Sequence, residues 1–272
     1  MKKTFILFLI LLVTAVAQAQ PAPQPMVHPW QGKRVAYFGD SITDPRVKAG
    51  TEKWWTLLSE WLGITPYCYA ISGRQWNDIP RQTNALLTEH GQDFDAILIF
   101  MGTNDYNAAI PLGEWYEETT IEMTNYRDNQ PLTETRRLRT LAINDSTYRG
   151  RINKALDEMK RTFPTKQIVL LTPIHRAIFT SRSKGTIQPD DRHSNTIGLW
   201  LEQYVDDVSE AGRIWAMPVI DLYSVSGLNP ALDEQASYFT SSERDRLHPN
   251  DSGYLRIART LYYQLMALPC DF

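Results

Sequence analysis

The chain has 272 residues, 43% of them hydrophobic, and its 28 Lys and Arg against 31 Asp and Glu give a formal net charge of −3. Proteins that bind nucleic acid or anionic membranes are usually strongly basic, so this mildly acidic chain gives no reason to expect either partner. A chain of this length can bury a full core.

The N-terminus has the pattern of a cleavable export signal. Two lysines at positions 2 and 3 precede an unbroken apolar run at 5–13, and Ala17-Gln18-Ala19 supplies the small residues that a signal peptidase recognises. A membrane-spanning helix needs ~18 or more apolar residues, which this run lacks. We therefore expect residues 1–19 to be a signal peptide cleaved after Ala19, and the protein to be secreted or periplasmic with no membrane anchor.

The next residues predict a short leader and then one domain. Residues 20–30 are rich in proline and predict an extended leader. No Gly/Ser-rich linker or repeat interrupts residues 31–272, so we expect a single domain there.

Apolar runs of strand length alternate with stretches of helical period in this domain. The runs lie at 35–38, 67–71, 96–101, 168–171 and 219–222, and their near-continuous apolarity is typical of parallel strands that are covered on both faces. Amphipathic patterns predict helices at 54–61, 152–159, 197–208 and 254–265. The alternation predicts an α/β fold, a three-layer α/β/α sandwich around a five-stranded parallel sheet.

Polar or small residues stand just past three of the predicted strands. Ser41, Gly73 and Asn104 each follow a strand end, and parallel strand ends meet at one edge of a sheet. Ser41 and Asn104 also have plain alternative roles, because Ser is a common helix cap and Asn a common turn residue. Downstream, Asp245 and His248 are spaced so that one short loop could supply both. A hydroxyl, an imidazole and a carboxylate are the parts of a serine-hydrolase triad.

Four sequence blocks in this order resemble those of the SGNH hydrolases, also called GDSL lipases or acylhydrolases. The blocks are Gly39-Asp40-Ser41-Ile42, Ser72-Gly73, Gly102-Thr103-Asn104-Asp105 and Asp245-Arg246-Leu247-His248-Pro249-Asn250. In place of the Asn-x-Gly that the family often has before the second block, this chain has Cys68-Tyr69-Ala70.

The resemblance implies a flavodoxin-like fold and a role for each matching residue. Ser41 would be the nucleophile, His248 the general base and Asp245 its carboxylate partner. The oxyanion hole would consist of the Ser41 and Gly73 backbone N–H groups and the Asn104 side-chain amide.

The sequence gives no sign of a cofactor or a metal. None of the five histidines stands four residues from another, the two cysteines, Cys68 and Cys270, are far apart, and Gly39 lacks the partner glycines of a dinucleotide fingerprint. We expect no metal and no cofactor. Whether the two cysteines form a disulfide, the oligomeric state and the host stay open.

Two long connections, 107–148 and 173–195, are expected to overhang the site. Candidate substrate contacts are Arg74, Trp76, Trp115 and His175. Aromatic faces beside basic groups suit sugar rings better than acyl tails. The alternative is that these aromatic residues pack the loops onto the body and contact no substrate. We therefore predict an exported serine esterase that removes short acyl groups, acetyl above all, from a carbohydrate. A lipid acylhydrolase or thioesterase of the same family, and a non-catalytic glycan-binding module, remain as alternatives.

Overall fold

The central sheet has five parallel strands, as predicted. The computed structural model describes residues 27–181, 186–188 and 190–270, so the expected signal peptide and most of the leader lie outside the described residues. The strand order is β2-β1-β3-β6-β9, and every pairing is parallel. The strands are β1 (Arg34–Gly39), β2 (Thr65–Cys68), β3 (Ala96–Phe100), β6 (Gln167–Leu171) and β9 (Val219–Ile220).

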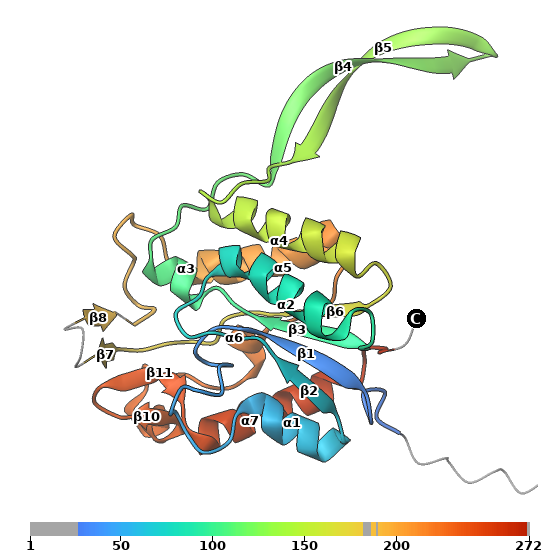
Figure 1. Ribbon diagram of the computed structural model, residues 1–272. Helices are drawn as coiled ribbons and strands as arrows, with labels where there is room; N and C mark the ends of the chain where they lie inside the picture. Colours follow the sequence, from blue (N-terminus) through green and yellow to red (C-terminus); the bar gives the residue numbers. More distant parts are fainter. Residues whose placement is uncertain (1–26, 182–185, 189, 271–272) are drawn as a thin grey trace, which may run out of the picture.

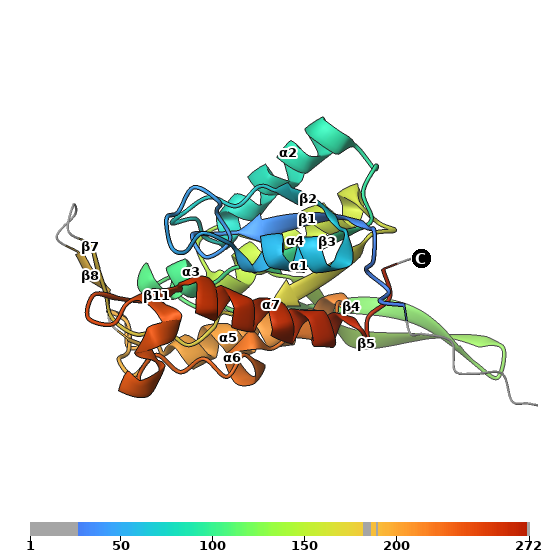
Figure 2. The same ribbon diagram turned by 90° about the horizontal axis from the view of Figure 1, so that it is seen from below.

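Helices cover both faces of this sheet (Figures 1 and 2). Alternate residues of β3 enter two separate cores, because successive side chains of a strand point to opposite faces. Leu98 packs with α1 and α7, whereas Ile97 and Ile99 pack with α2, α4 and α5. These helices are α1 (Trp54–Leu62), α2 (Ile79–His90), α4 (Tyr148–Thr162), α5 (Leu201–Trp215) and α7 (Asp251–Leu265). The predicted three-layer sandwich is confirmed.

Some predicted boundaries are wrong. Helix α5 begins at Leu201 rather than at 197, because the Asn195 side chain accepts the Ile197 and Leu199 backbone N–H groups in a turn. Helix α2 has no counterpart among the predicted helices. In the described part of the chain, no helix is long and apolar enough to cross a membrane. Short helices are α3 (Thr103–Asn107), η1 (Trp76–Asp78), α6 (Leu222–Val225) and η2 (Asp233–Tyr238).

The first long connection is mostly a β-ribbon. Strands β4 (Tyr116–Arg127) and β5 (Gln130–Leu141) pair antiparallel over their full length. Asp128 and Asn129 join them with φ of 50° and 61°, the left-handed geometry of a two-residue type I′ turn. The ribbon extends away from the body, not across the carboxyl edge of the sheet (Figures 1 and 2). The expectation that 107–148 overhangs the site is therefore wrong.

The second long connection belongs to a small sheet at that carboxyl edge. This sheet has the order β10-β11-β7-β8, and β11 pairs antiparallel with β10 and β7. The strands are β7 (Phe179–Ser181), β8 (Thr186–Gln188), β10 (Phe239–Ser241) and β11 (Asp245–Pro249). Asp245 and His248 thus lie on a strand rather than a loop, and the β7–β11 pairing brings part of 173–195 beside them.

Candidate active site

Ser41 lies in a tight turn directly after β1. The Asp40 carbonyl accepts the Thr43 and Asp44 N–H groups at 3.1 and 2.8 Å, which forms one helical turn around the serine. A Cβ at Gly39 would lie 2.7 Å from Thr43 Oγ1 and 2.8 Å from the Phe100 carbonyl oxygen, so only glycine allows this close approach. The turn holds the Ser41 hydroxyl at the carboxyl edge of the sheet, where it is 5% exposed.

His248 connects Ser41 to Asp245. Its Nε2 lies 2.9 Å from Ser41 Oγ, and its Nδ1 lies 3.0 Å from both carboxylate oxygens of Asp245. Asp245 Oδ1 also accepts the backbone N–H groups of Leu247 and His248 at 3.2 and 2.9 Å, which fixes the carboxylate. The Phe179 ring meets the imidazole edge to face at 5.1 Å. This geometry allows the imidazole to accept the serine proton while the carboxylate holds its other N–H.

Two backbone donors stand open at this edge. The Ser41 and Gly73 N–H groups have no hydrogen-bond partner among the described residues. Gly73 has φ of 79°, a left-handed conformation that favours glycine, in a turn closed by the Arg74 N–H donating to the Ile71 carbonyl at 3.2 Å. The Ser72 N–H donates to Asp44 at 2.8 Å, which fastens this turn to the serine turn.

Asn104 lies in the first turn of α3 and is bound on two sides. Its Nδ2 donates to Asp40 Oδ2 at 3.1 Å and to the Arg74 carbonyl at 3.0 Å. Both amide hydrogens are therefore engaged in the free protein. A third acceptor near Asn104 has to share one of them or displace the Arg74 carbonyl.

Asp40 joins the serine turn to Asn104. Its Oδ1 accepts the Ile42 N–H at 3.1 Å while its Oδ2 accepts from Asn104. Burial raises the pKa of Asp40 to about 6, and the Ile42 N–H, His248 and Arg176 oppose that rise. Asp40 contacts the backbone and Asn104, which gives it a structural role in the turn.

Asp105 also has a structural role, and it is more deeply buried than Asp40. Its fully buried carboxylate accepts the Trp76 backbone N–H at 3.2 Å and Arg151 Nη1 at 3.1 Å. Burial raises the pKa of Asp105 to about 7 despite these two donors. It ties α3 to η1 and α4.

Trp76 and Trp115 do not present their rings to a substrate, and that expectation is wrong. Trp76 is fully buried, and its Nε1 donates to Tyr148 Oη at 3.2 Å. Trp115 is 5% exposed in the core beneath α4 and α5, and its Nε1 donates to Glu210 at 2.8 Å. Their large apolar surface is used to fill that layer of the sandwich.

Arg74 and His175 differ in their relation to the site. Arg74 contributes its carbonyl to Asn104, and its side chain is 53% exposed. His175 stacks on Tyr223 at 3.6 Å between ring centres, and its Nδ1 lies 2.7 Å from Asp191 Oδ2. These partners hold His175, and the structure shows no contact between it and Ser41 or His248.

Arg176 is a site-supporting residue that the sequence reasoning missed. It is fully buried, and it donates to Thr103 Oγ1 at 3.0 Å and to Gln188 at 2.6 Å. Burial lowers its pKa to about 10. Arg176 thus links the turn before Asn104 to β8. The only signal in the sequence was its place just after a predicted strand.

Neither a metal cluster nor a disulfide is found in the part of the chain that the structure describes. No group of three His, Cys, Asp or Glu side chains there is arranged to hold a metal ion. No disulfide joins Cys68 to Cys270, and burial raises the pKa of the Cys68 thiol to about 11.

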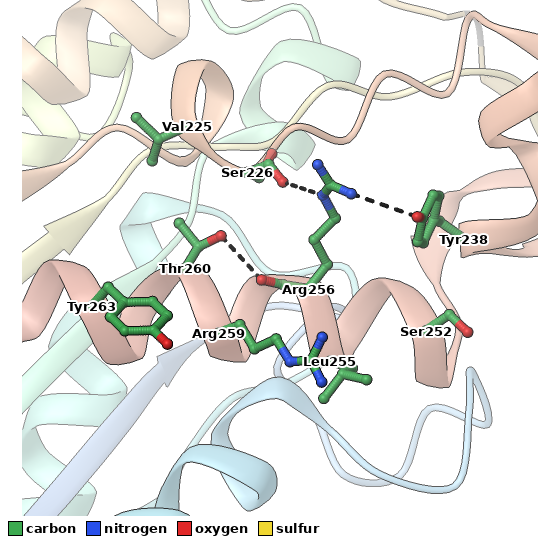
Figure 3. A pocket seen from close by; sticks show the side chains of 9 residues that line it. All are labelled: Val225, Ser226, Tyr238, Ser252, Leu255, Arg256, Arg259, Thr260 and Tyr263. Atoms are coloured by element: carbon green, nitrogen blue, oxygen red, sulfur yellow. Dashed lines mark hydrogen bonds between the residues drawn. The ribbon is translucent and has the colours of Figure 1, made fainter.

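A pocket of about 480 Å³ on α7 is separate from these residues (Figure 3). Arg256 crosses it and donates to the Ser226 carbonyl at 2.8 Å, so this arginine is engaged within the protein. None of the residues that line the pocket belongs to the Ser41 cluster.

Comparison with known proteins identifies relatives. The model of the GDSL-like Lipase/Acylhydrolase family matches residues 37–256. No curated protein matches the chain in sequence.

Solved structures share the fold at low identity. A Lactobacillus plantarum protein has TM-score 0.63 and 21% identity, covering 88% of this chain and 98% of its own. A possible lipase from Chitinophaga pinensis has TM-score 0.63 and 19% identity, covering 87% and 98%. A salicylyl-acyltransferase from a tetracycline biosynthetic pathway has TM-score 0.56 and 11% identity, covering 88% and 56%.

Proposed function

Because the chain belongs to the GDSL-like lipase/acylhydrolase family and is thus an ester-bond hydrolase, we propose that Ser41, His248 and Asp245 are its catalytic triad. The observation that carries this proposal is the 2.9 Å contact between Ser41 Oγ and His248 Nε2. The bond from His248 Nδ1 to Asp245 supports it, because a base has to be oriented by a third group.

The reaction has two halves. In the first, His248 takes the proton of Ser41 as Oγ attacks the ester carbonyl, and it then gives that proton to the leaving alkoxide. In the second, His248 activates a water molecule that hydrolyses the acyl-enzyme, and Ser41 regains its proton. Asp245 holds the imidazole and stabilises its charged form in both halves.

The oxyanion is stabilised by three donors in this proposal. The Ser41 and Gly73 N–H groups are open in the free protein, so they can bind the oxyanion without breaking a bond. The Asn104 amide is the third donor, and it has to give up or share its bond to the Arg74 carbonyl. Fixed donors of this kind act mainly on the transition state, where the negative charge develops.

We propose short acyl esters of a carbohydrate as substrate. The loop at 190–200 packs on α3 through the bond from Tyr106 Oη to the His193 carbonyl. This loop exposes 66% of the Arg192 side chain and ends at Trp200, which is 46% exposed. Arg192 pairs with Asp190 at 2.9 Å, so the half-exposed indole of Trp200 is the stronger candidate for a sugar contact and replaces the buried tryptophans in that role.

The proposal includes export. Residues 1–19 would be removed as a signal peptide, leaving the leader and the catalytic domain at 31–272 in the periplasm or medium. Sequencing the N-terminus of the exported protein should give Gln20 as its first residue. A chain retained in the cytoplasm with Met1 intact would contradict this part.

Acyl-length preference tests the substrate class. We expect kcat/KM on p-nitrophenyl esters to fall from acetyl to butyryl to octanoyl, because a buried methylene contributes ~0.8 kcal/mol only where an apolar groove receives it. Efficiency that rises with chain length would instead favour a lipid substrate. Absence of turnover on every ester and on acetylated oligosaccharides would favour a binding module.

A matched pair of tryptophan variants tests the sugar contact. Trp200→Ala should lower kcat/KM on an acetylated oligosaccharide about tenfold and leave hydrolysis of the small acetyl ester unchanged. Trp61→Ala is the control, because Trp61 is similarly exposed, at 40%, but lies on α1. Equal losses on both substrates would remove Trp200 from the substrate contacts.

A further inference from the structure

The β4–β5 ribbon is long and isolated. Its strands have twelve residues each and pair without a bulge from Tyr116 opposite Leu141 to Arg127 opposite Gln130. Beyond its base, the ribbon stands clear of the body (Figures 1 and 2). A two-stranded hairpin alone is at best marginally stable in water, and its unpaired edges are templates for another strand. Among the residues that the structure describes, no third strand pairs with the ribbon to stabilise it.

Whereas Tyr116, Tyr126 and Leu141 lie on one face of the ribbon, its other large apolar side chains lie on the second face. The register and the alternation of side chains place four of them on this face, namely Ile121, Met123, Leu132 and Leu138. Glu134 and Arg136 stand between the two leucines, and Arg136 Nε donates to Glu134 at 3.1 Å. On the opposite face, Glu118 binds Arg137 and Arg139 at 2.9 and 2.7 Å.

The outer edge of β5 is able to form a ladder. A two-residue turn makes Arg127 and Gln130 a hydrogen-bonded pair, so every second residue of β5 from 131 onwards directs its backbone groups outward. Thr133, Thr135, Arg137 and Arg139 can therefore pair with a further strand. Pro131 also faces this edge, and its missing N–H ends the ladder near the tip.

We propose that two copies of this chain dimerise by pairing the outer edges of their β5 strands antiparallel, with the twofold axis at Thr135. In this register Glu134 lies opposite Arg136 of the partner subunit, and Leu132 lies opposite Leu138 of the partner subunit. The four charges at the axis alternate in sign, and the two leucine pairs continue the apolar face across the dimer.

Charge selects this register over its neighbours. A shift of the axis by one residue in one direction places Arg136 opposite Arg136 of the partner subunit, and a shift in the other direction places Glu134 opposite Glu134 of the partner subunit. Like charges directly opposite one another are destabilising. The outer edge of β4 is less suited to such pairing, because its one basic residue is Arg127 at the turn, and the register that places Glu117 opposite Arg127 of the partner subunit also places Glu122 opposite Glu122 of the partner subunit.

The register also fits the length of the ribbon. Thr135 is close to the middle of β5, so Thr133 lies opposite Arg137 of the partner subunit and Pro131 lies opposite Arg139 of the partner subunit, where each end of the ladder lacks the proline's N–H. The tip of each ribbon ends beside the base of the other, and the two bodies stand at opposite ends. The product is a four-stranded sheet in a closed twofold dimer, in which both copies use the same surface and the β4 edges lie on the outside.

A cysteine at the axis tests the pairing. Thr135→Cys should form a covalent dimer in high yield under mild oxidation, because hydrogen-bonded antiparallel pairs have Cα atoms ~5.5 Å apart, within disulfide range. Thr124→Cys is the matched control on the outer edge of β4 and should form little, as should the parent chain with its own two thiols. A yield from Thr124→Cys that equals or exceeds that from Thr135→Cys overturns the proposal.

Two further measurements test the dimer: its mass in solution, and its Kd when the charges of Glu134 and Arg136 are exchanged. The mature protein should have twice the monomer mass, Arg136→Glu should raise the dimer Kd at least tenfold, and Arg136→Glu with Glu134→Arg should restore it. All of these variants should hydrolyse the small acetyl ester as the parent does. A monomer at high concentration overturns the proposal, as does a dimer unaffected by Arg136→Glu. If the protein is a monomer and the ribbon variants lose turnover of the oligosaccharide but not of the small ester, the proposal is overturned and the ribbon contacts the substrate instead.

Discussion

Replacing Asn104 by Ala removes a side chain that donates to two acceptors in the free protein and to the oxyanion in the proposed transition state. Loss of an oxyanion donor costs ~2.7–4 kcal/mol in other hydrolases. Here one hydrogen first has to leave the Arg74 carbonyl, and the bond it breaks is worth ~0.5–1.5 kcal/mol. The net effect is ~1.2–3.5 kcal/mol, which lowers kcat roughly 8- to 370-fold.

The same variant should lose stability in a pH-dependent way. Asp40 keeps the Ile42 N–H but loses the Asn104 donor, and a buried carboxylate that loses a donor costs ~1–3 kcal/mol. The pKa of Asp40 is about 6, so at pH 5 this group is mostly protonated in the folded protein and the lost bond matters less. We expect the drop in the free energy of unfolding to be larger at pH 8 than at pH 5.

Steady-state kinetics on the acetyl ester, well below the unfolding temperature, measure the first effect, and urea unfolding at the two pH values measures the second. Asn84→Ala is the control, because the hydrogen bond of the Asn84 side chain goes to the surface residue Glu158. A raised KM with unchanged kcat would make Asn104 a ground-state contact and refute the oxyanion role. Equal stability losses at both pH values would refute the role of Asp40.

Three further outcomes follow from the structure. Ser41→Ala and His248→Ala should each abolish ester hydrolysis, and the double variant should be no worse than either alone because the two act as a unit; normal turnover in Ser41→Ala would end the triad proposal. Burial raises the pKa of Asp105 to about 7, so between pH 4 and 7 this group holds a proton in the folded state that it loses in the unfolded state. The free energy of unfolding therefore falls as pH rises from about 4 to 7. Asp105→Asn should flatten that slope in urea unfolding. Trp76→Ala should lower the free energy of unfolding by ~3–5 kcal/mol and leave KM for the small ester unchanged, whereas a raised KM in folded protein would restore Trp76 as a substrate contact.

The sequence predicted the sheet and the polar residues at its edge. Ala96–Phe100 is apolar at every position, and only a strand covered on both faces buries such a run. Ser41 and Asn104 directly follow two buried strands of this kind, Gly73 follows the edge strand β2, and parallel strands bring their carboxyl ends together. These predictions rest on local patterns of alternation and on one general rule of topology.

Other features depended on contacts between residues far apart in the chain. Trp76 and Trp115 have the composition of substrate contacts, yet both rings fill the core, because burial depends on which helices cover them. Phe179 contacts His248 because β7 pairs with β11, and no local sequence pattern predicts that pairing.

The β4–β5 ribbon also depends on tertiary packing. The sequence predicted only a long connection at 107–148 and no strand there, and the ribbon's direction away from the site is set by where its base joins the body. By itself the sequence determined the five strands of the central sheet, the order of the motifs and the chemistry that they can perform, but not the strands of the ribbon or of the small sheet. Which side chains reach the substrate, which are buried and which surface is left for a partner were decided by tertiary packing, because exposure is a property of the neighbours that a residue acquires on folding.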